Sequence, residues 1–140
     1  MNSYEEVGKV MSANVITING NSNLLAATEL FEIYNIHHLP VVNDEGSLRG
    51  IISQTDIDRI KVGATLFRNP QKEDYDEALL QSVLAYQIMT RNVTELQPDD
   101  SIKTAYNIFK KNKFRAIPIV GKGVLLGIIT PLDILDYFFN

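Results

Sequence analysis

Cysteine is absent from the 140 residues of the chain. Without thiols there is no disulfide, no thiolate metal ligand and no cysteine nucleophile. A glycine-rich phosphate loop and a recognisable Ser-His-Asp set are also missing. These absences weigh against an enzyme, because catalytic sites need convergent reactive groups. The lack of cysteine also fits a cytoplasmic location.

Long apolar runs and an excess of basic residues are missing as well. The longest apolar stretches are far too short to span a bilayer, so we expect no membrane insertion. Glu5 and Glu6 stand near the N-terminus, where a signal peptide needs basic residues. The formal net charge of -4 disfavours a broad nucleic-acid surface. The remaining composition, 45% hydrophobic, is that of a globular chain with one compact domain or two small halves sharing a core.

The chain contains an internal duplication. Three stretches recur in the same order: 11–15 (MSANV) as 89–93 (MTRNV), 35–42 (NIHHLPVV) as 113–120 (KFRAIPIV), and 50–57 (GIISQTDI) as 127–134 (GIITPLDI). The first two pairs share one offset, which changes by a single residue across a Gly-containing turn before the third. Length changes are tolerated at such turns. A repeat of this kind decides the fold.

Each copy predicts the element order β-α-β-β-α. For the first copy the expected elements are a strand over 15–18, a helix over 23–35, strands over 39–43 and 48–52, and a helix from 54 to about 63. A helix over 101–113 is its counterpart in the second copy. One copy alone would leave one face of its sheet bare. We therefore expect an α/β (α+β) fold in which two repeats pack with pseudo-twofold symmetry into one module.

The boundaries follow from the repeat. We place the first repeat at 7–63, a linker at 64–87 and the second repeat at 88–140. Within the linker, the polar stretch 68–74 contains a proline and predicts a loop. The stretch from 77 to 88 is rich in helix formers and predicts a helix that leads into the second copy.

These stretches together resemble the CBS-domain pair, a regulatory module named after cystathionine β-synthase. The resemblance covers nearly the whole chain, from about Val10 to Phe138, and no stretch is left over for a catalytic or transport domain. It implies a stand-alone pair that binds an adenine nucleotide, or in some members S-adenosylmethionine, in clefts between the repeats. It also implies a shape change that a partner protein reads, and a homodimer.

In the stretches 50–57 and 127–134 a predicted strand turns into a predicted helix. This repeated corner has a purely structural interpretation. Ser53 and Asp56 are three residues apart, as are Thr130 and Asp133, and this is the spacing of a helix N-cap and its first-turn carboxylate. Pro131 favours the same helix start. Such a cap stabilises a helix without any ligand.

The same spacing also suits a ligand. A helix N-terminus presents backbone N–H groups that attract phosphate. A carboxylate held there can accept hydrogen bonds from both vicinal hydroxyls of a ribose. The resemblance implies these roles: Asp56 holds the ribose, and hydroxyls such as Ser53 and Thr55 meet the phosphate. An aspartate can serve as a cap when the site is empty and as a ligand when it is filled.

The resemblance pairs the corner of one copy with the opening segment of the other, which is the stretch that begins at Met11 or Met89. One implied cleft consists of Thr90, Val93, Thr94, Arg115, Ser53, Thr55 and Asp56. The second consists of Ser12, Val15, Ile16, His37, His38, Thr130 and Asp133. The opening segments would flank adenine and the basic residues would meet phosphate.

The two clefts differ in chemistry. The first has Arg115, a permanent fork-shaped cation, and hydroxyls at both Ser53 and Thr55. The second has Leu132 in place of the second hydroxyl, and its histidines are only partly charged at neutral pH. We therefore rank the Asp56 cleft as the better nucleotide site.

The preferred function is a sensor that binds AMP, ADP or ATP, without a catalytic cofactor. The alternatives are a ligand-free scaffold that dimerises and binds an unidentified protein partner, or an S-adenosylmethionine binder. A metal site is disfavoured, because adjacent His37 and His38 point to opposite faces of an extended chain. The apolar C-terminus, 137–139, is expected either to close the core or to lie in a dimer interface, and we favour the interface.

Overall fold

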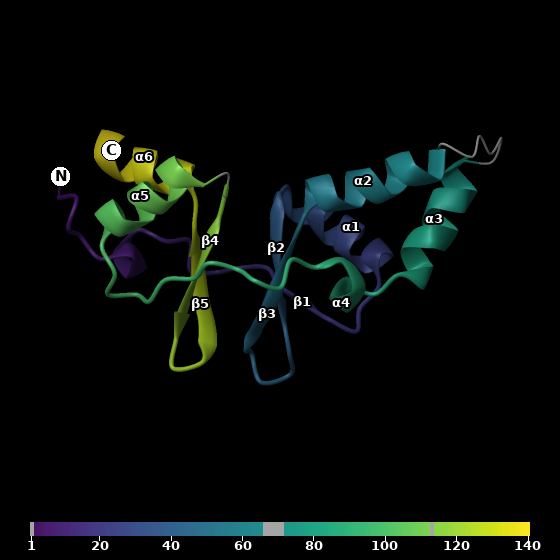
Figure 1. The fold of residues 1–140 in the computed structure, drawn as a ribbon, viewed down its shortest axis with the longest axis horizontal. Coiled ribbons are helices and arrows are strands. Elements are labelled where there is room, and N and C mark those ends of the chain that lie inside the picture. Colours follow the sequence, from purple (N-terminus) through teal and green to yellow (C-terminus); the bar gives the residue numbers. More distant parts are fainter. Residues whose placement is uncertain (1, 66–71, 113) are drawn as a thin grey trace. The chain divides into compact units, whose positions relative to one another are not determined.

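The structure of the chain, a computed structural model, describes residues 2–65, 72–112 and 114–140. Its helices and strands form two compact units, which are described separately (Figure 1). The N-repeat unit comprises Ile16–Asp44 and Arg49–Arg91, and the C-repeat unit comprises Met1–Val15, Glu45–Leu48 and Asn92–Asn140. Each unit therefore combines the body of one sequence repeat with the residues that open the other, 88–91 or 7–15.

The N-repeat unit has a three-stranded sheet with helices. Its elements are β1 (Ile18–Asn19), α1 (Leu24–Tyr34), β2 (His38–Val42), β3 (Leu48–Ser53), α2 (Gln54–Thr65), α3 (Lys72–Ser82) and α4 (Ala85–Ile88). The strand order is β1-β2-β3, and β1 runs parallel to β2 with Ile18 opposite Val41. The α/β class and the predicted succession of helices and strands are confirmed.

Helix α1 shows why the sequence pattern located its helix well. The Asn23 side chain caps the start by accepting from the Ala26 N–H at 2.9 Å. Asn35 ends the helix in the left-handed conformation, with φ of 51°. Both signals are local, so the observed helix differs from the predicted one only by its caps.

Two predicted boundaries in or near this unit are wrong. The strand predicted over 15–18 is reduced to β1, because only Ile18 and Asn19 pair with β2. Of the loop predicted over 68–74, residues 68–71 lie outside the described residues, and Lys72 already begins α3. Lysine and glutamate are good helix formers, so polarity alone did not require a loop there.

The helix predicted over 77–88 is in fact two helices. Between α3 and α4 the chain pairs with the turn that precedes α1: Leu24 N donates to Val83 O at 2.9 Å, and Ala85 N donates to Ser22 O at 2.8 Å. Leu84 N donates to the Gln87 side chain at 2.8 Å and starts the second helix. Tertiary hydrogen bonds therefore interrupt a stretch whose intrinsic propensity is helical throughout.

The C-repeat unit is built around a single β-hairpin. Its elements are the short 3₁₀ helix η1 (Val7–Lys9), α5 (Ile102–Lys111), β4 (Ile117–Gly121), β5 (Val124–Ile129) and α6 (Pro131–Phe139). Strands β4 and β5 are antiparallel, with Ile117 opposite Ile129. The first strand of this repeat is only an isolated bridge between Leu96 and Ile119. Figure 1 shows α5 and α6 together beside this hairpin.

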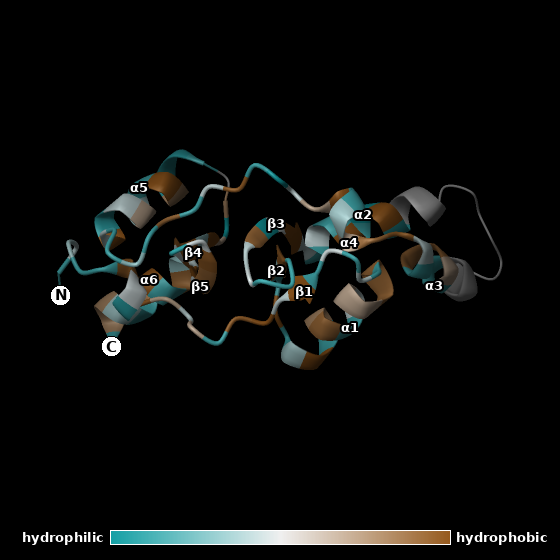
Figure 2. Ribbon diagram, turned by 90° about the horizontal axis from the view of Figure 1, so that it is seen from below, coloured by the Kyte–Doolittle hydropathy of each residue, from teal (hydrophilic) through white to brown (hydrophobic). Residues whose placement is uncertain are grey.

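Each unit has its own hydrophobic core. The N-repeat core consists of Ile18, Leu24, Ala27, Phe31, Leu39, Val41, Ile52, Ile57, Leu80, Ala85 and Met89. The C-repeat core consists of Val7, Leu96, Ile102, Ala105, Ile117, Ile119, Ile129 and Ile134. Figure 2 shows hydrophobic residues interspersed with hydrophilic ones along the helices, as amphipathic packing requires. Each core thus includes side chains from an opening segment, Met89 in one unit and Val7 in the other.

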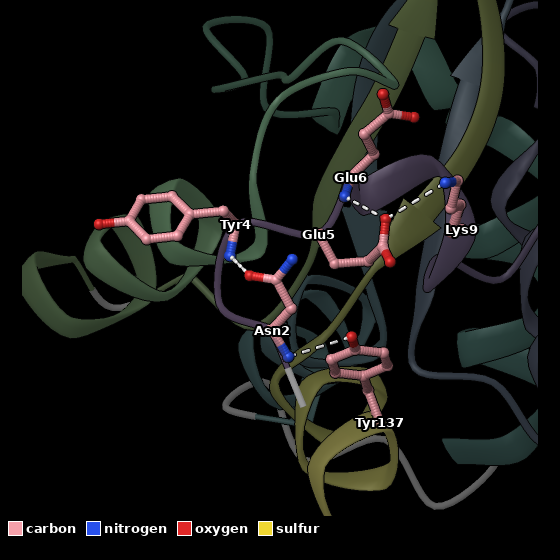
Figure 3. Close-up of polar contacts among 6 residues, drawn as sticks. All are labelled: Asn2, Tyr4, Glu5, Glu6, Lys9 and Tyr137. Carbon is pink, nitrogen blue, oxygen red and sulfur yellow. Dashed lines mark hydrogen bonds and ion pairs between the residues drawn. The ribbon is translucent and has the colours of Figure 1, made fainter.

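The two chain ends meet in the C-repeat unit. Asn2 N donates to the Tyr137 hydroxyl at 3.3 Å, and Glu5 forms an ion pair with Lys9 at 3.4 Å (Figure 3). Tyr137 and Phe138 pack against the core, whereas Phe139 is 82% exposed. The C-terminal aromatic residues are therefore divided, with the first two closing the core and the last one at the surface. Nowhere in the described ranges is a helix long and apolar enough to cross a membrane.

Candidate functional site

The repeated corner forms the same cap in both units. At the junction of β3 and α2, Ser53 N donates to Asp56 Oδ2 at 2.9 Å, and Asp56 N donates to Ser53 Oγ at 3.2 Å. At the junction of β5 and α6, Thr130 N donates to Asp133 Oδ2 at 2.9 Å, and Asp133 N donates to Thr130 Oγ1 at 3.2 Å. The cap that the spacing predicts is present, and it fixes one oxygen of each aspartate.

The N-termini of α2 and α6 offer fewer free backbone N–H groups to a phosphate than the sequence pattern predicts. Gln54 N donates to the His37 carbonyl at 3.1 Å, so this first-turn group of α2 already has a partner. At α6 the corresponding residue is Pro131, which has no N–H. A phosphate at either corner would therefore depend more on hydroxyls and cations than on the helix start itself.

Each opening segment is bound to the strand that leads into a corner. Ile51 N donates to Thr90 O at 3.1 Å and Thr90 N donates to Ile51 O at 2.9 Å. In the other unit, Ser12 N donates to Ile128 O at 2.9 Å and Ile128 N donates to Ser12 O at 3.0 Å. These bridges place Thr90 and Ser12 beside the two corners, as the implied pairing of opening segment and corner expects.

Glycine permits this close approach. A Cβ on Gly50 would lie 2.6 Å from the Thr90 carbonyl oxygen and 2.7 Å from the Met89 sulfur. A Cβ on Gly127 would lie 2.5 Å from the Met11 sulfur and 2.7 Å from the Ser12 carbonyl oxygen. Any side chain at these two positions would push the opening segment away from the corner.

The second oxygens of the two aspartates have different neighbours. Asp56 Oδ1 lies 3.8 Å from Arg59 Nη1, in a loose ion pair with a guanidinium whose side chain is 77% exposed. Asp133 Oδ1 instead accepts from Ser12 Oγ at 3.3 Å. No hydrogen bond joins the equivalent hydroxyl of Thr90 to Asp56 in the part of the chain that the structure describes. The Asp56 carboxylate therefore keeps more acceptor capacity for a ligand.

The two histidines lie beside the α2 corner. His37 Nδ1 is 3.3 Å from Gln54 Oε1, a hydrogen bond that requires the proton on Nδ1. His38 is half-buried, and burial lowers its pKa; the neighbouring His37 lowers it further, and Asp56 opposes the shift. His38 therefore shares its environment with Asp56. Its implied grouping with Asp133 stays a prediction, because Asp133 belongs to the other unit.

The remaining implied site residues are divided between the units. Thr55 is exposed in the first turn of α2, and Ile16 belongs to the same N-repeat unit. Val15, Val93, Thr94 and Arg115 belong to the C-repeat unit, where Arg115 is exposed. Their share in a cleft stays a prediction. Over the described ranges there is no group of three or more His, Asp or Glu that could hold a metal ion.

Some contacts at the corners were not anticipated from the sequence. The Asp56–Arg59 pair had a visible signal, since oppositely charged residues three apart on a helix are neighbours. The matching Met and Gly residues of the two copies were a signal for the packing of Met89 on Gly50. The bond between the His37 carbonyl and Gln54 had none, because it depends on how β2 is placed against α2.

The CBS-domain family model matches residues 7–63 and 85–140, so the chain belongs to the CBS-domain family. CBS pairs are regulatory ligand-binding modules rather than catalysts.

Three known proteins are similar to the chain in sequence or in fold. Protein MJ1225 of Methanocaldococcus jannaschii is 32% identical over 141 residues, which cover 97% of this chain but 45% of the relative, so the chain spans less than half of that protein. The CBS pair of protein MJ0100, solved with 5′-methylthioadenosine and S-adenosyl-L-methionine, is 26% identical with a TM-score of 0.72, and 97% of each chain is covered. CBSX2, solved with AMP, is 19% identical with a TM-score of 0.78 and 96% coverage of each chain, a likeness that concerns the fold alone.

Proposed function

We propose that this chain is a small-ligand sensor that binds an adenine nucleotide (AMP, ADP or ATP) at the Asp56 corner. The observation that carries the proposal is the state of the Asp56 carboxylate. Its Oδ2 is fixed by Ser53 N at 2.9 Å, while its Oδ1, among the described residues, forms a loose 3.8 Å ion pair with the exposed Arg59 and accepts no hydrogen bond. A carboxylate that is held rigidly and still has free lone pairs is suited to the vicinal hydroxyls of a ribose.

The neighbouring groups support a ligand that carries phosphate. Ser53 and Thr55 place hydroxyls at the start of α2, and His37 is an exposed imidazole beside Gln54. Through the Ile51 bridge Thr90 lies alongside β3, so the segment that would flank a flat base is held close to the corner. The relative MJ0100, solved with two adenosyl compounds, supports an adenosine group as the common part of the ligand. S-adenosylmethionine is therefore the alternative ligand to be tested.

The test separates the cap from ligand binding. Asp56→Asn keeps an oxygen that can accept from Ser53 N but removes the charge and one acceptor. Losing charged hydrogen bonds to a ribose should weaken binding by about 1.5–3 kcal/mol, or roughly 10- to 150-fold. Isothermal titration with AMP, ADP, ATP and S-adenosylmethionine measures this loss.

The 2′-deoxy analogue of the best ligand is the matched control. It should bind the wild type weakly and should lose little more in Asp56→Asn, because the variant and the analogue remove the same interaction. Equal affinities of wild type and Asp56→Asn for every ligand would refute the assignment to Asp56.

A second candidate, a dimerising scaffold, is favoured by one feature of the C-repeat unit. Helix α6 exposes Leu132 at 63%, Leu135 at 52% and Phe139 at 82%. Contiguous exposed apolar residues are typical of contact surfaces. Leu135→Glu should convert a dimer to a monomer in analytical ultracentrifugation, whereas Asp136→Glu, which changes the neighbouring exposed position without removing an apolar side chain, should not. A monomeric wild type, or a dimer unaffected by Leu135→Glu, would argue against this surface.

A further inference from the structure

The two repeats differ in what touches the second oxygen, Oδ1, of the corner aspartate. In the C-repeat unit, Ser12 Oγ donates to Asp133 Oδ1 at 3.3 Å. The other oxygen, Oδ2, already accepts from Thr130 N at 2.9 Å. Both oxygens of Asp133 therefore have protein donors.

Ser12 is held in position by its backbone. Its N–H and C=O both bond to Ile128, at 2.9 and 3.0 Å. Met11 packs against Gly127, where no side chain stands between the opening segment and β5. The hydroxyl can rotate about its own side-chain torsion, but its Cα is fixed beside the corner. Breaking the bond to Asp133 therefore requires only a rotamer change, not a backbone movement.

The N-repeat unit provides the matched comparison. Thr90 stands at the same repeat position and has the same two backbone bonds, to Ile51. Within the described ranges its hydroxyl makes no bond to Asp56, whose Oδ1 lies 3.8 Å from the exposed Arg59. The two corners thus share the cap and the bridge, and differ in the side-chain donor.

We propose that the Ser12 hydroxyl is an internal competitor for the acceptor oxygen of Asp133, so that the C-repeat corner is self-occupied while the Asp56 corner is open. The inference rests on the proposed function, in which these aspartates accept hydrogen bonds from ribose hydroxyls. A ligand at Asp133 must displace one hydroxyl with another, and it gains correspondingly less. Ser12 is then a residue that determines which of the two corners a ligand prefers.

The size of the effect follows from the geometry. The bond is long at 3.3 Å, and Ser12 is exposed, so its net value is that of an ordinary hydrogen bond rather than a buried charged one. Removing it should strengthen binding at the Asp133 corner by roughly 2- to 10-fold.

The experiment isolates the Asp133 corner in the 140-residue chain. With AMP and, in parallel, S-adenosylmethionine as probes, titration compares Asp56→Asn with Asp56→Asn/Ser12→Ala. The double variant should bind at least one probe 2- to 10-fold more tightly, and adding Asp133→Asn should abolish that gain. Asp56→Asn/Ser12→Thr keeps a hydroxyl and should bind like Asp56→Asn.

The failures of the two proposals are distinguishable. If wild type binds a probe and Asp56→Asn weakens it, but Ser12→Ala brings no gain, the proposed function stands and the competitor is refuted. If Ser12→Ala gains affinity that depends on Asp133 while Asp56→Asn matches wild type, the competitor stands and the Asp56 assignment falls. If neither wild type nor Ser12→Ala binds AMP or S-adenosylmethionine at millimolar concentration, both proposals fall.

Discussion

Gly50→Ala should destabilise the N-repeat unit strongly for a change of one methyl group. The new Cβ would lie 2.6 Å from the Thr90 carbonyl oxygen, which is backbone and cannot rotate away. Overpacking of this kind costs about 1–3 kcal/mol. Moving the opening segment aside would also weaken the two Ile51–Thr90 hydrogen bonds, each contributing about 1 kcal/mol. The free energy of unfolding should therefore fall by about 2–4 kcal/mol.

Urea unfolding and thermal melts followed by circular dichroism measure this loss. For a chain of this size the Tm should fall by roughly 6–16 °C. Gly123→Ala is the control, because nothing lies within 4 Å of its Cβ and only its φ of +77° opposes a side chain. It should cost about 1 kcal/mol. A Gly50→Ala variant no less stable than Gly123→Ala would refute the close approach of the opening segment to β3.

Two further predictions concern the same unit. Since His38 has a lowered pKa in the folded chain, the unfolded state binds more protons near pH 6. The contribution of His38 to the free energy of unfolding should therefore be fully present above the ordinary histidine pKa of about 6.5 and should be lost as the pH falls below it. His38→Gln should flatten this part of the profile in urea unfolding at several pH values, with His37→Gln as the comparison, and an unchanged slope would contradict the burial of His38. A fragment spanning 16–91 should unfold cooperatively, whereas a fragment spanning 1–63 should not, because the latter lacks the buried Leu80, Ala85 and Met89. Burial of a leucine or methionine side chain stabilises the fold by about 1.5–3 kcal/mol, and burial of alanine by somewhat less. Calorimetry of both fragments decides the point, and cooperative unfolding of 1–63 would show that the opening segment of the second repeat is dispensable.

Much of the fold was predictable because its signals are local. The caps at Asn23 and Ser53 and the hairpins follow from residues within a few positions of one another. The duplication supplied a second, independent copy of each signal. The residues of the corner cap were identified for the same reason, since a Ser and an Asp three residues apart need only a helix start to meet.

Long-range contacts were not predictable in the same way. No glycine or proline marks the break between α3 and α4; it is imposed by Ser22 and Leu24, some sixty residues earlier in the chain. The bond from Ser12 to Asp133 joins the two ends of the sequence, and nothing in either residue type distinguishes it from the absent bond between Thr90 and Asp56. Such differences depend on side-chain positions that only packing sets.

The distribution of the opening segments has a consequence for how such a chain arises. Each compact unit is completed by a segment of the other repeat, Met89 and Thr90 in one case and Val7 to Ser12 in the other. A primordial protein with a single repeat would have to obtain its missing segment from a second molecule, at a cost that depends on concentration. Joining two copies in one chain replaces that encounter with a high effective concentration. The duplication thus removes a dependence on protein abundance, and once joined, neither copy can be deleted without leaving the other incomplete.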